Sequence, residues 1–161
     1  MAYALDSLMK IRIRREDTAR SELTAARLRM SEAQNELEAR KEEFRLYEET
    51  KDERRERIFA AILGRTVGAD ELEMAREGIS RIDEEGNLKA DNIVRAESIL
   101  RDREKEVESA RDVLVFATKN RMKIEEHRSN WLTISAAEED YRQEIELEDF
   151  IGKKVLDDRG Q

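Results

Sequence analysis

Apolar side chains recur every seven residues through the first third of this sequence. The repeat consists of Leu23, Met30, Leu37 and Phe44, with Ala26 and Ala33 three places after the first two members. A repeat of seven with an inner step of three forms an apolar stripe along one side of a long helix. Such a stripe needs another helix packed against it, so the repeat predicts a coiled coil.

A matching stripe lies further along the same chain. One register contains Ile93, Leu100, Val107 and Leu114, and the other contains Ala96, Ala110, Ala117, Ile124, Trp131 and Ile145. If the chain folds back so that the numbers of facing residues add to about 155, large side chains meet small ones. This register pairs Phe44 with Ala110, Leu37 with Ala117 and Met30 with Ile124, and puts Trp131 between Leu23 and Ala26. We therefore expect an all-α fold, a long antiparallel two-helix coiled-coil hairpin.

Glycines and capping residues give the expected boundaries. Gly64 and Gly68 would end the first helix, Asp70 would cap a short amphipathic helix, and Gly86 would end it. We expect one hairpin domain over residues 1–161, with a first helix at about 4–63, a tip with the short helix at about 64–91, a second helix at about 92–151 and a frayed tail at 152–161.

The composition suits a long helical rod better than a globule. Charged residues make up 43% of the chain, aromatic residues 5%, and proline is absent. The net charge of −8 argues against a protein that coats nucleic acid. The basic cluster Lys10–Arg20 includes Glu16 and Asp17, so a solvated or ion-paired helix face is favoured there over nucleic-acid binding. Binding of this cluster to nucleic acid or to a membrane surface is the least favoured function, because the net charge is negative.

Other absences exclude further classes. Without cysteine the chain has no disulfide scaffold and no thiol-based site. No signal-peptide pattern and no apolar run of about 18 residues is found, so we expect a cytoplasmic protein that does not insert into the membrane.

Nothing in the sequence predicts an enzyme, a metal site or a cofactor. His127 lies beside the apolar stripe, near Leu28 in the expected register, and lacks partners for a metal. The run from Gly152 to Lys154 lacks the upstream glycine of a phosphate loop, and Val155 stands where a magnesium ligand is needed. Trp131 fits the seam better than an exposed interface anchor.

Apolar side chains cover more than a narrow seam at both ends of the expected hairpin. At the start these are Leu5, Leu8, Met9, Ile11 and Ile13, where ragged patterning and a docking face are equally good explanations. Near the tip, Phe59, Ile62, Leu63, Leu72 and Ile79 would lie beyond the cover of the second helix and are interface candidates. The same register lays Lys10, Arg12, Arg14 and Arg15 alongside Asp140, Glu144 and Glu146.

The first sixteen residues carry a motif, Tyr3-x-Leu5-x-x-Leu8-x-x-Ile11-Arg12-x-Arg14-Arg15-Glu16. In a charged hairpin of this length, the motif resembles the YscO/FliJ-like family of type III secretion proteins, nearer to the YscO type. The resemblance implies the central stalk of a hexameric export ATPase. Such a stalk enters the hexamer pore, promotes ATPase assembly and activity, and reaches towards the cytoplasmic domain of the export gate. Family members also bind chaperones of secreted substrates, and the protein would lie in the cytoplasm, peripheral to the inner-membrane apparatus.

Carried over by position, the resemblance assigns two sets of binding residues. The ATPase-binding set is Leu8, Lys10, Arg12, Arg14 and Arg15, with Glu144, Glu146 and Glu148 on the facing helix. The gate or chaperone surface would lie towards the tip, at Phe59, Ile62, Leu63, Leu72 and Ile79. The alternative is a coiled-coil adaptor or chaperone-escort protein without a link to an ATPase.

Overall fold

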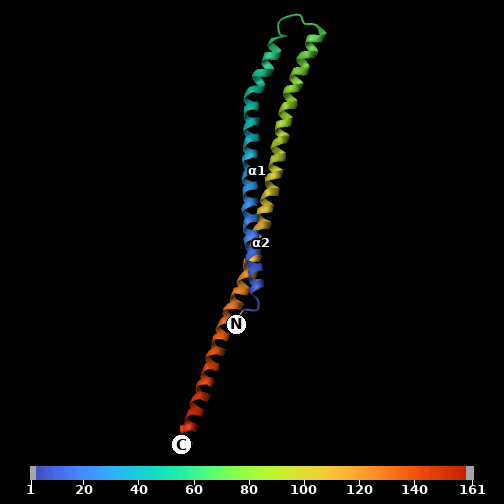
Figure 1. The fold of residues 1–161 in the computed structure, drawn as a ribbon. Coiled ribbons are helices and arrows are strands. Elements are labelled where there is room, and N and C mark those ends of the chain that lie inside the picture. The colour runs from blue at the N-terminus through green and yellow to red at the C-terminus, as the bar shows by residue number, and fades with distance from the viewer. Residues whose placement is uncertain (1–2, 159–161) are drawn as a thin grey trace. The chain divides into compact units, whose positions relative to one another are not determined.

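Two long helices make up almost all of the chain that the structure describes. The computed structural model describes residues 3–158, with side chains up to residue 151. Helix α1 spans Asp6–Ala60 and helix α2 spans Ala69–Asp158, and no strand occurs in the described residues (Figure 1). The helices run in opposite directions and pack against each other, so the predicted all-α helical hairpin is confirmed.

The hairpin divides into two compact units, and each contains a piece of both helices. Unit 1 combines residues 1–21 with residues 112–161, and unit 2 comprises residues 22–111, including the turn. Whether residues 1–161 act as one domain stays a prediction.

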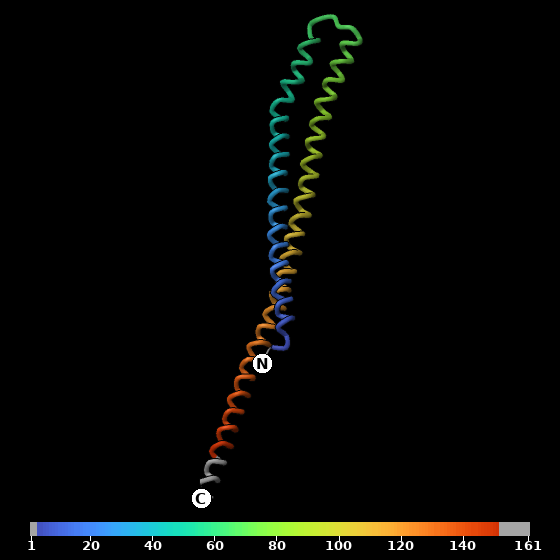
Figure 2. The backbone as a smooth tube through the Cα atoms, in the orientation of Figure 1, coloured from blue at the N-terminus to red at the C-terminus, as the bar shows by residue number. Residues whose placement is uncertain are grey.

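The turn of unit 2 is much shorter than the sequence predicted. Gly64 adopts a left-handed φ of 78°, and the backbone N–H of Gly68 donates to the Glu71 carboxylate at 3.3 Å, which caps the start of α2. From Ala69 onward α2 continues through Gly86 without a break (Figure 2). The expected short helix at 64–91 and the expected start of the second helix near 92 are therefore wrong. Gly152 does not end α2 either, and residues 159–161 of the expected tail lie outside the described residues.

Gly86 is used for close helix packing instead of helix termination. A Cβ atom at Gly86 would lie only 2.7 Å from two ring carbons of Tyr47, so only glycine leaves room for this ring. Tyr47 is buried, and its hydroxyl donates to the backbone carbonyl of Ile82 at 2.7 Å. Gly78 makes similar room for Ile58, whose Cδ1 would be 3.0 Å from an added Cβ. These contacts explain why both glycines lie inside a helix.

The shorter turn also changes the register of the two helices. Arg29 pairs with Glu106 at 3.3 Å and Ile58 meets Gly78, so the numbers of facing residues add to about 135 in place of about 155. Phe44 lies beside the Tyr47 ring and shares a surface hollow with Gly86. The expected pairing of Phe44 with Ala110 is therefore wrong. The other expected pairings depend on the same register and are therefore also wrong. They are Leu37 with Ala117, Met30 with Ile124, and Trp131 with Leu23 and Ala26.

The residues assigned to the seam are mostly correct even though their partners are not. The buried members are Leu23, Ala26, Ala33 and Leu37 on α1, and Ala96, Val107 and Ala117 on α2. Ile145 is exposed and does not belong to the seam. The three basic interruptions of the first stripe are partly covered and each forms an ion pair: Arg40 with Glu36 and Glu43, Lys51 with Glu48, and Arg54 with Glu85.

Unit 1 contains a buried carboxylate at its centre. Glu16 is 6% exposed and accepts hydrogen bonds from the Thr118 hydroxyl at 3.2 Å and from the Arg121 guanidinium. Arg20 adds an ion pair to the same carboxylate at 3.1 Å. Hydrogen bonds to Glu125 and to Glu16 raise the pKa of Arg121, so its guanidinium stays charged. This network joins α1 and α2 within unit 1.

We predict that Gly86→Ala lowers the free energy of unfolding by about 1–3 kcal/mol, because the added methyl group would overpack the Tyr47 ring. At a helical site without such a neighbour, replacing glycine by alanine stabilises the helix by about 1 kcal/mol. In a Tyr47→Leu background the ring is gone, and Gly86→Ala should become neutral or stabilising. Urea unfolding followed by circular dichroism measures both effects, and a stabilising Gly86→Ala with Tyr47 intact would contradict the packing.

We predict that Arg121→Met destabilises unit 1 by about 2 kcal/mol, because it leaves the buried Glu16 carboxylate without its main partner. The value lies below that of a fully buried pair, since the Arg121 side chain is 25% exposed. The double variant Glu16→Leu with Arg121→Met should recover most of the loss. Hydrogen exchange of unit 1 amides measures this, with unit 2 amides as the internal control. A double variant no better than Arg121→Met would argue against the network.

Candidate docking surfaces

Three aromatic rings attach the start of α1 to α2. Tyr3 is buried, its hydroxyl is 2.8 Å from Nδ1 of His127, and its ring centroid is 5.4 Å from that of Trp131. His127 therefore has a structural partner and does not lie near Leu28, where the sequence register put it. Trp131 is half-buried against Tyr3 and not against the expected seam residues. The covered part of α2 in unit 1 ends just beyond these rings.

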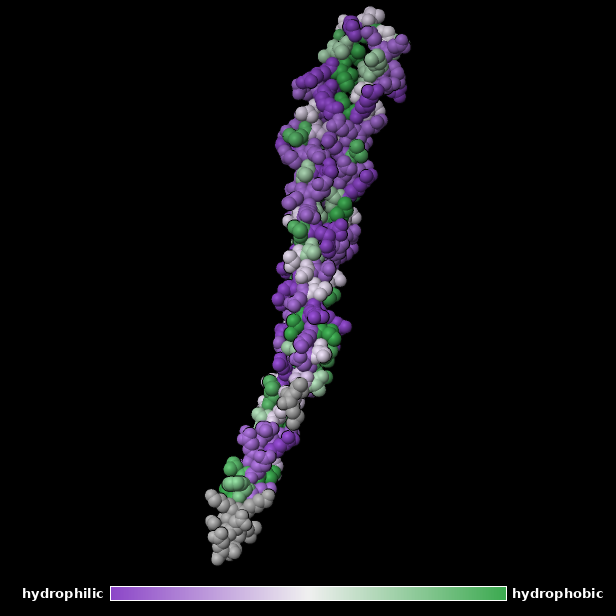
Figure 3. Space-filling model, viewed as in Figure 1, coloured by the Kyte–Doolittle hydropathy of each residue, from purple (hydrophilic) through white to green (hydrophobic). Residues whose placement is uncertain are grey.

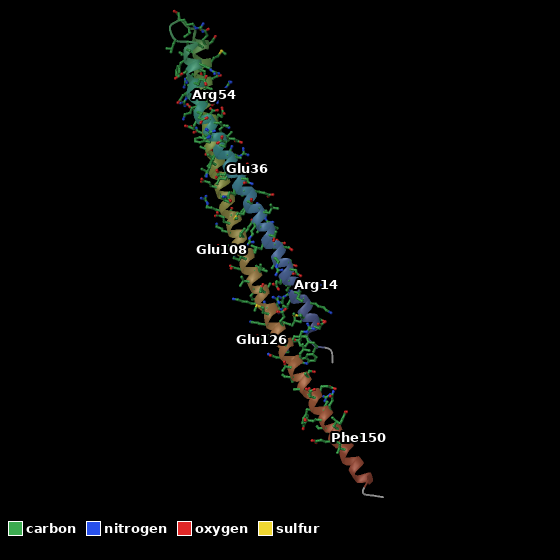
Figure 4. The ribbon with its side chains drawn as sticks, turned by 90° about the vertical axis from the view of Figure 1, so that its left-hand side faces the viewer. Arg14, Glu36, Arg54, Glu108, Glu126 and Phe150 are labelled. Carbon is green, nitrogen blue, oxygen red and sulfur yellow. The ribbon has the colours of Figure 1, made fainter. Side chains whose placement is uncertain are left out.

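The basic residues assigned to ATPase binding follow directly on α1. Lys10 pairs with Asp6 at 2.9 Å, and this lysine lowers the pKa of the Asp6 carboxyl by hydrogen bonding and by its charge. Arg14 and Arg15 are exposed and form no ion pair with any side chain in the described part of the protein. Leu8 and Arg12 are half-buried against the hairpin. Two neighbouring arginines of α1 are thus exposed to solvent, and Figure 4 labels Arg14.

The acidic residues of the same predicted set lie elsewhere in unit 1. From residue 136 to residue 151 every side chain of α2 is exposed, and we call this stretch the uncovered segment. It contains Glu144, Glu146 and Glu148, so these carboxylates do not lie alongside Lys10, Arg12, Arg14 and Arg15. The same holds for Asp140. The expectation was wrong because the shorter turn carries this part of α2 past the start of α1.

The uncovered segment combines acidic and large apolar side chains. Seven carboxylates and one arginine lie between residues 138 and 149. The exposed apolar side chains of the uncovered segment include Tyr141, Ile145, Leu147, Phe150 and Ile151. Figure 3 shows these apolar groups interrupting the polar surface, and Figure 4 shows Phe150 on a part of α2 with no helix beside it. Apolar side chains of this size in water indicate a surface that binds another molecule.

A second apolar surface lies at the turn of unit 2, which we call the turn patch. Phe59, Leu63, Leu72 and Met74 are exposed, while Ile62 and Ile79 are half-buried. Ile62 and Ile79 are therefore more covered than the sequence predicted. A groove of about 450 Å³ runs between the helices here, lined by Ile58, Ile62, Met74 and Ala75 with Arg57, Arg65 and Glu71 among its polar residues. Figure 3 shows apolar groups gathered over this region.

Sequence reasoning missed the polar contacts that hold the helices in register, although two of them had a visible signal. Glu16 occurs seven residues before Leu23, and Tyr47 occurs fourteen residues after Ala33, so both continue the seven-residue repeat. A carboxylate at a seam position needs a buried partner, and that requirement could have predicted a basic residue opposite Glu16. The contact between Tyr3 and His127 had no such signal, because it depends on the register.

The described residues also lack some kinds of site. No helix in residues 3–158 offers the unbroken apolar length that crossing a bilayer demands. The same part of the chain contains no cluster of three or more histidine or acidic side chains placed to hold a metal ion.

Comparisons with known proteins agree with this hairpin. The sequence matches the family profile described as type III secretion protein YscO over residues 5–153. Among solved structures, CT670 of Chlamydia trachomatis, described as a candidate YscO homolog, is similar with a TM-score of 0.75 and 20% identity. The match covers 100% of this chain and 99% of CT670. At this identity the likeness shows the fold. A comparison with curated protein sequences finds no match. Because the family profile covers nearly all of the sequence, the chain belongs to the YscO family of type III secretion proteins.

Proposed function

We propose that this chain is the non-catalytic central stalk of a type III secretion export ATPase. Its membership of the YscO family supports a place in the secretion apparatus. The observation that carries the stalk role is the uncovered segment, in which sixteen consecutive residues of a helix have no partner within the described protein. A single helix is about 10–12 Å wide, which is slim enough to enter a pore between protein subunits.

The ATPase would bind the uncovered segment and the exposed basic residues of α1. Arg14 and Arg15 carry positive charge that no neighbouring carboxylate neutralises in the described residues. Glu144, Glu146 and Glu148 carry negative charge beside exposed apolar groups. These surfaces suit a binding site with an apolar wall and charges of both signs. The chain needs no catalytic group for this role.

The mechanism would be mechanical and allosteric. A stalk without six-fold symmetry inside a ring of six subunits contacts each subunit differently. The contacts would favour a different conformation in each subunit, and nucleotide turnover would then be coupled to the position of the stalk. The protein would work in the cytoplasm, beside the membrane-bound apparatus.

We propose the turn patch as the surface for the export gate or for substrate chaperones. Its exposed apolar residues Phe59, Leu63 and Leu72 border an open groove, which is the kind of surface that a partner helix or loop can fill. The patch belongs to unit 2, whereas the proposed ATPase-binding residues belong to unit 1. The two surfaces can therefore be tested separately.

We predict that this protein increases hexamer formation and ATP hydrolysis by its cognate ATPase, and that Arg14→Glu with Arg15→Glu reduces the stimulation at least tenfold. Reversing both charges replaces attraction by repulsion at the docking surface. Steady-state ATPase assays and the mass of the assembled ATPase measure the two effects. Both arginines are exposed, so circular dichroism should show an unchanged hairpin.

The matched control is Arg95→Glu with Arg101→Glu, which reverses two exposed arginines on α2 in unit 2. It should leave the stimulation intact if the effect belongs to the start of α1. An ATPase whose rate and assembly do not respond to the wild-type chain would contradict the stalk role.

We predict that Leu63→Asp with Leu72→Asp abolishes binding to the gate domain or to secretion chaperones and leaves ATPase stimulation unchanged. Binding of an apolar partner would bury the new aspartate carboxylates without a partner for their charge. The free-energy cost of that burial prevents binding. Leu88→Asp with Val94→Asp, at equally exposed positions of unit 2, is the control. Calorimetry with purified partners measures the binding. Binding of chaperones without any response of the ATPase would favour the alternative role of a chaperone-escort adaptor.

A further inference from the structure

The face of α2 that Tyr3 covers continues beyond this contact without a cover. Tyr3 packs on His127, with ring centroids 5.9 Å apart. Ile134 and Tyr141 follow His127 at successive steps of seven residues, which keeps them on the same face of the helix. Ile145 lies four residues after Tyr141 and continues this face. All three side chains lie in unit 1 and are exposed, by 60%, 64% and 42%. We call Ile134, Tyr141 and Ile145 the bare stripe.

Carboxylates border the bare stripe on both edges. Two of them, Glu138 and Asp149, each lie four residues after a member of the stripe. Two others, Glu144 and Glu148, each lie three residues after a member. A step of four residues turns a helix by about 40° in one direction and a step of three by about 60° in the other, so the two pairs border opposite edges. All four are exposed, and none forms an ion pair with another described side chain.

The sequence around the bare stripe carries an excess of negative charge. Between residues 138 and 149, seven carboxylates stand against a single cation, Arg142, which lies four residues after Glu138 on the same edge. A partner surface without cations would displace the water around these carboxylates and leave their charges unpaired, which costs free energy. Charge complementarity therefore requires a partner that carries cations beside its apolar face.

We propose that the bare stripe is the docking site for a basic amphipathic helix of another protein. The apolar face of that helix packs on the bare stripe, and its lysines or arginines face the carboxylates on both edges. The packing of α1 on α2 is thereby continued past Tyr3 by a helix from a second molecule. That the export ATPase supplies this helix rests on the proposed stalk function, whereas the chemistry of the site does not.

A helix is the form of partner that this surface fits. The backbone N–H and C=O groups of α2 are bonded within the helix here, so a partner strand would find no groups to pair with its own backbone. A partner helix satisfies its own backbone and needs only side-chain contacts. The bare stripe runs for roughly 17 Å, or about three helical turns. Side chains three and four residues apart on the partner can pack along that length.

Charge disfavours the other possible occupants. The same segment of a second copy would bring carboxylates against carboxylates, whether the two helices ran parallel or antiparallel. An anionic lipid surface and a nucleic acid would be repelled in the same way. A protein helix with basic edges is the occupant that the charges favour.

Two synthetic peptides of about 20 residues test the sign of the partner's charge. Both carry leucine along one face, and the edges of that face carry lysine in one peptide and glutamate in the other. Like charges oppose the pairing of each peptide with itself. Calorimetry with the full chain should show binding of the lysine-edged peptide, and this binding should weaken as the salt concentration rises. The glutamate-edged peptide should bind about tenfold more weakly or not at all.

A pair of variants tests the apolar contact. Tyr141→Ser with Ile145→Ser should weaken binding of the lysine-edged peptide about tenfold or more, because it removes two of the three apolar groups of the bare stripe. Leu147→Ser with Phe150→Ser is the matched control, since it removes exposed apolar groups from another face of the same segment. The control should bind the peptide like the wild type. All four side chains are exposed, so circular dichroism should show an unchanged helix content.

A second pair of variants tests the charged edges. Glu144→Lys with Glu148→Lys should weaken binding of the lysine-edged peptide and strengthen binding of the glutamate-edged one. Glu139→Lys with Glu146→Lys makes the same change in net charge on another face of the helix. This control should bind the lysine-edged peptide about tenfold more tightly than the edge variant does.

Several outcomes would overturn the proposal. They are failure of the lysine-edged peptide to bind, equal binding of the two peptides, and a loss of binding in either control as large as in its partner variant. Sedimentation of the chain alone should give 18.9 kDa. A dimer that Tyr141→Ser with Ile145→Ser disrupts would show instead that a second copy covers the bare stripe.

The peptide experiments are independent of the ATPase experiments. A chain that stimulates its ATPase but does not bind the lysine-edged peptide would overturn the chemistry of the bare stripe and leave the stalk role standing. A chain that binds this peptide but has no effect on its ATPase would do the reverse. If both proposals hold, an excess of the lysine-edged peptide should suppress the stimulation of the ATPase.

Discussion

An amphipathic helix in water needs a partner for its apolar face, and α1 is too short to cover α2. The two helices have 55 and 90 residues, and both run from the same turn. Within unit 1, α1 does not cover the uncovered segment of α2. The apolar side chains of that segment are therefore not buried within the described chain. The proposed contact of unit 1 with an ATPase arises from this inequality in length.

The hydrophobic seam itself is narrow and mixed with charge. Six of the thirteen buried apolar residues in the described chain are alanines, and the first stripe admits Arg40, Lys51 and Arg54 beside carboxylates of the same or the facing helix. Exposed ion pairs of this kind contribute roughly 0–1 kcal/mol each, so they add little to stability. The specific contacts, namely Tyr47 against Gly86 and the Glu16 network, therefore decide which of several similar registers the helices adopt.

The sequence was sufficient for the fold class but not for the register. Seven-residue spacing identified Leu23, Ala26 and Leu37 as inward-facing, because periodicity depends only on the helix itself. The partner of each residue depends on the length of the turn, and there Gly86 was misleading. Glycine weakens a helix in isolation, yet here it admits a tyrosine ring from the other helix. The same error affected the predicted site residues. Arg14 and Arg15 lie at the surface as expected, but Glu144 and Glu146 were expected beside α1, which does not extend to them.

Tyr47 in its recess at Gly86 also has a mechanical meaning. A ring that occupies the space of a missing Cβ, with its hydroxyl bonded to the Ile82 carbonyl, resists sliding far more than a row of alanines does. A lengthwise pull on α1 against α2 within unit 2 would have to lift this ring over the neighbouring backbone before any other contact could move by a turn. The Tyr47 ring at Gly86 thus fixes the position of α1 along the axis of α2 within unit 2.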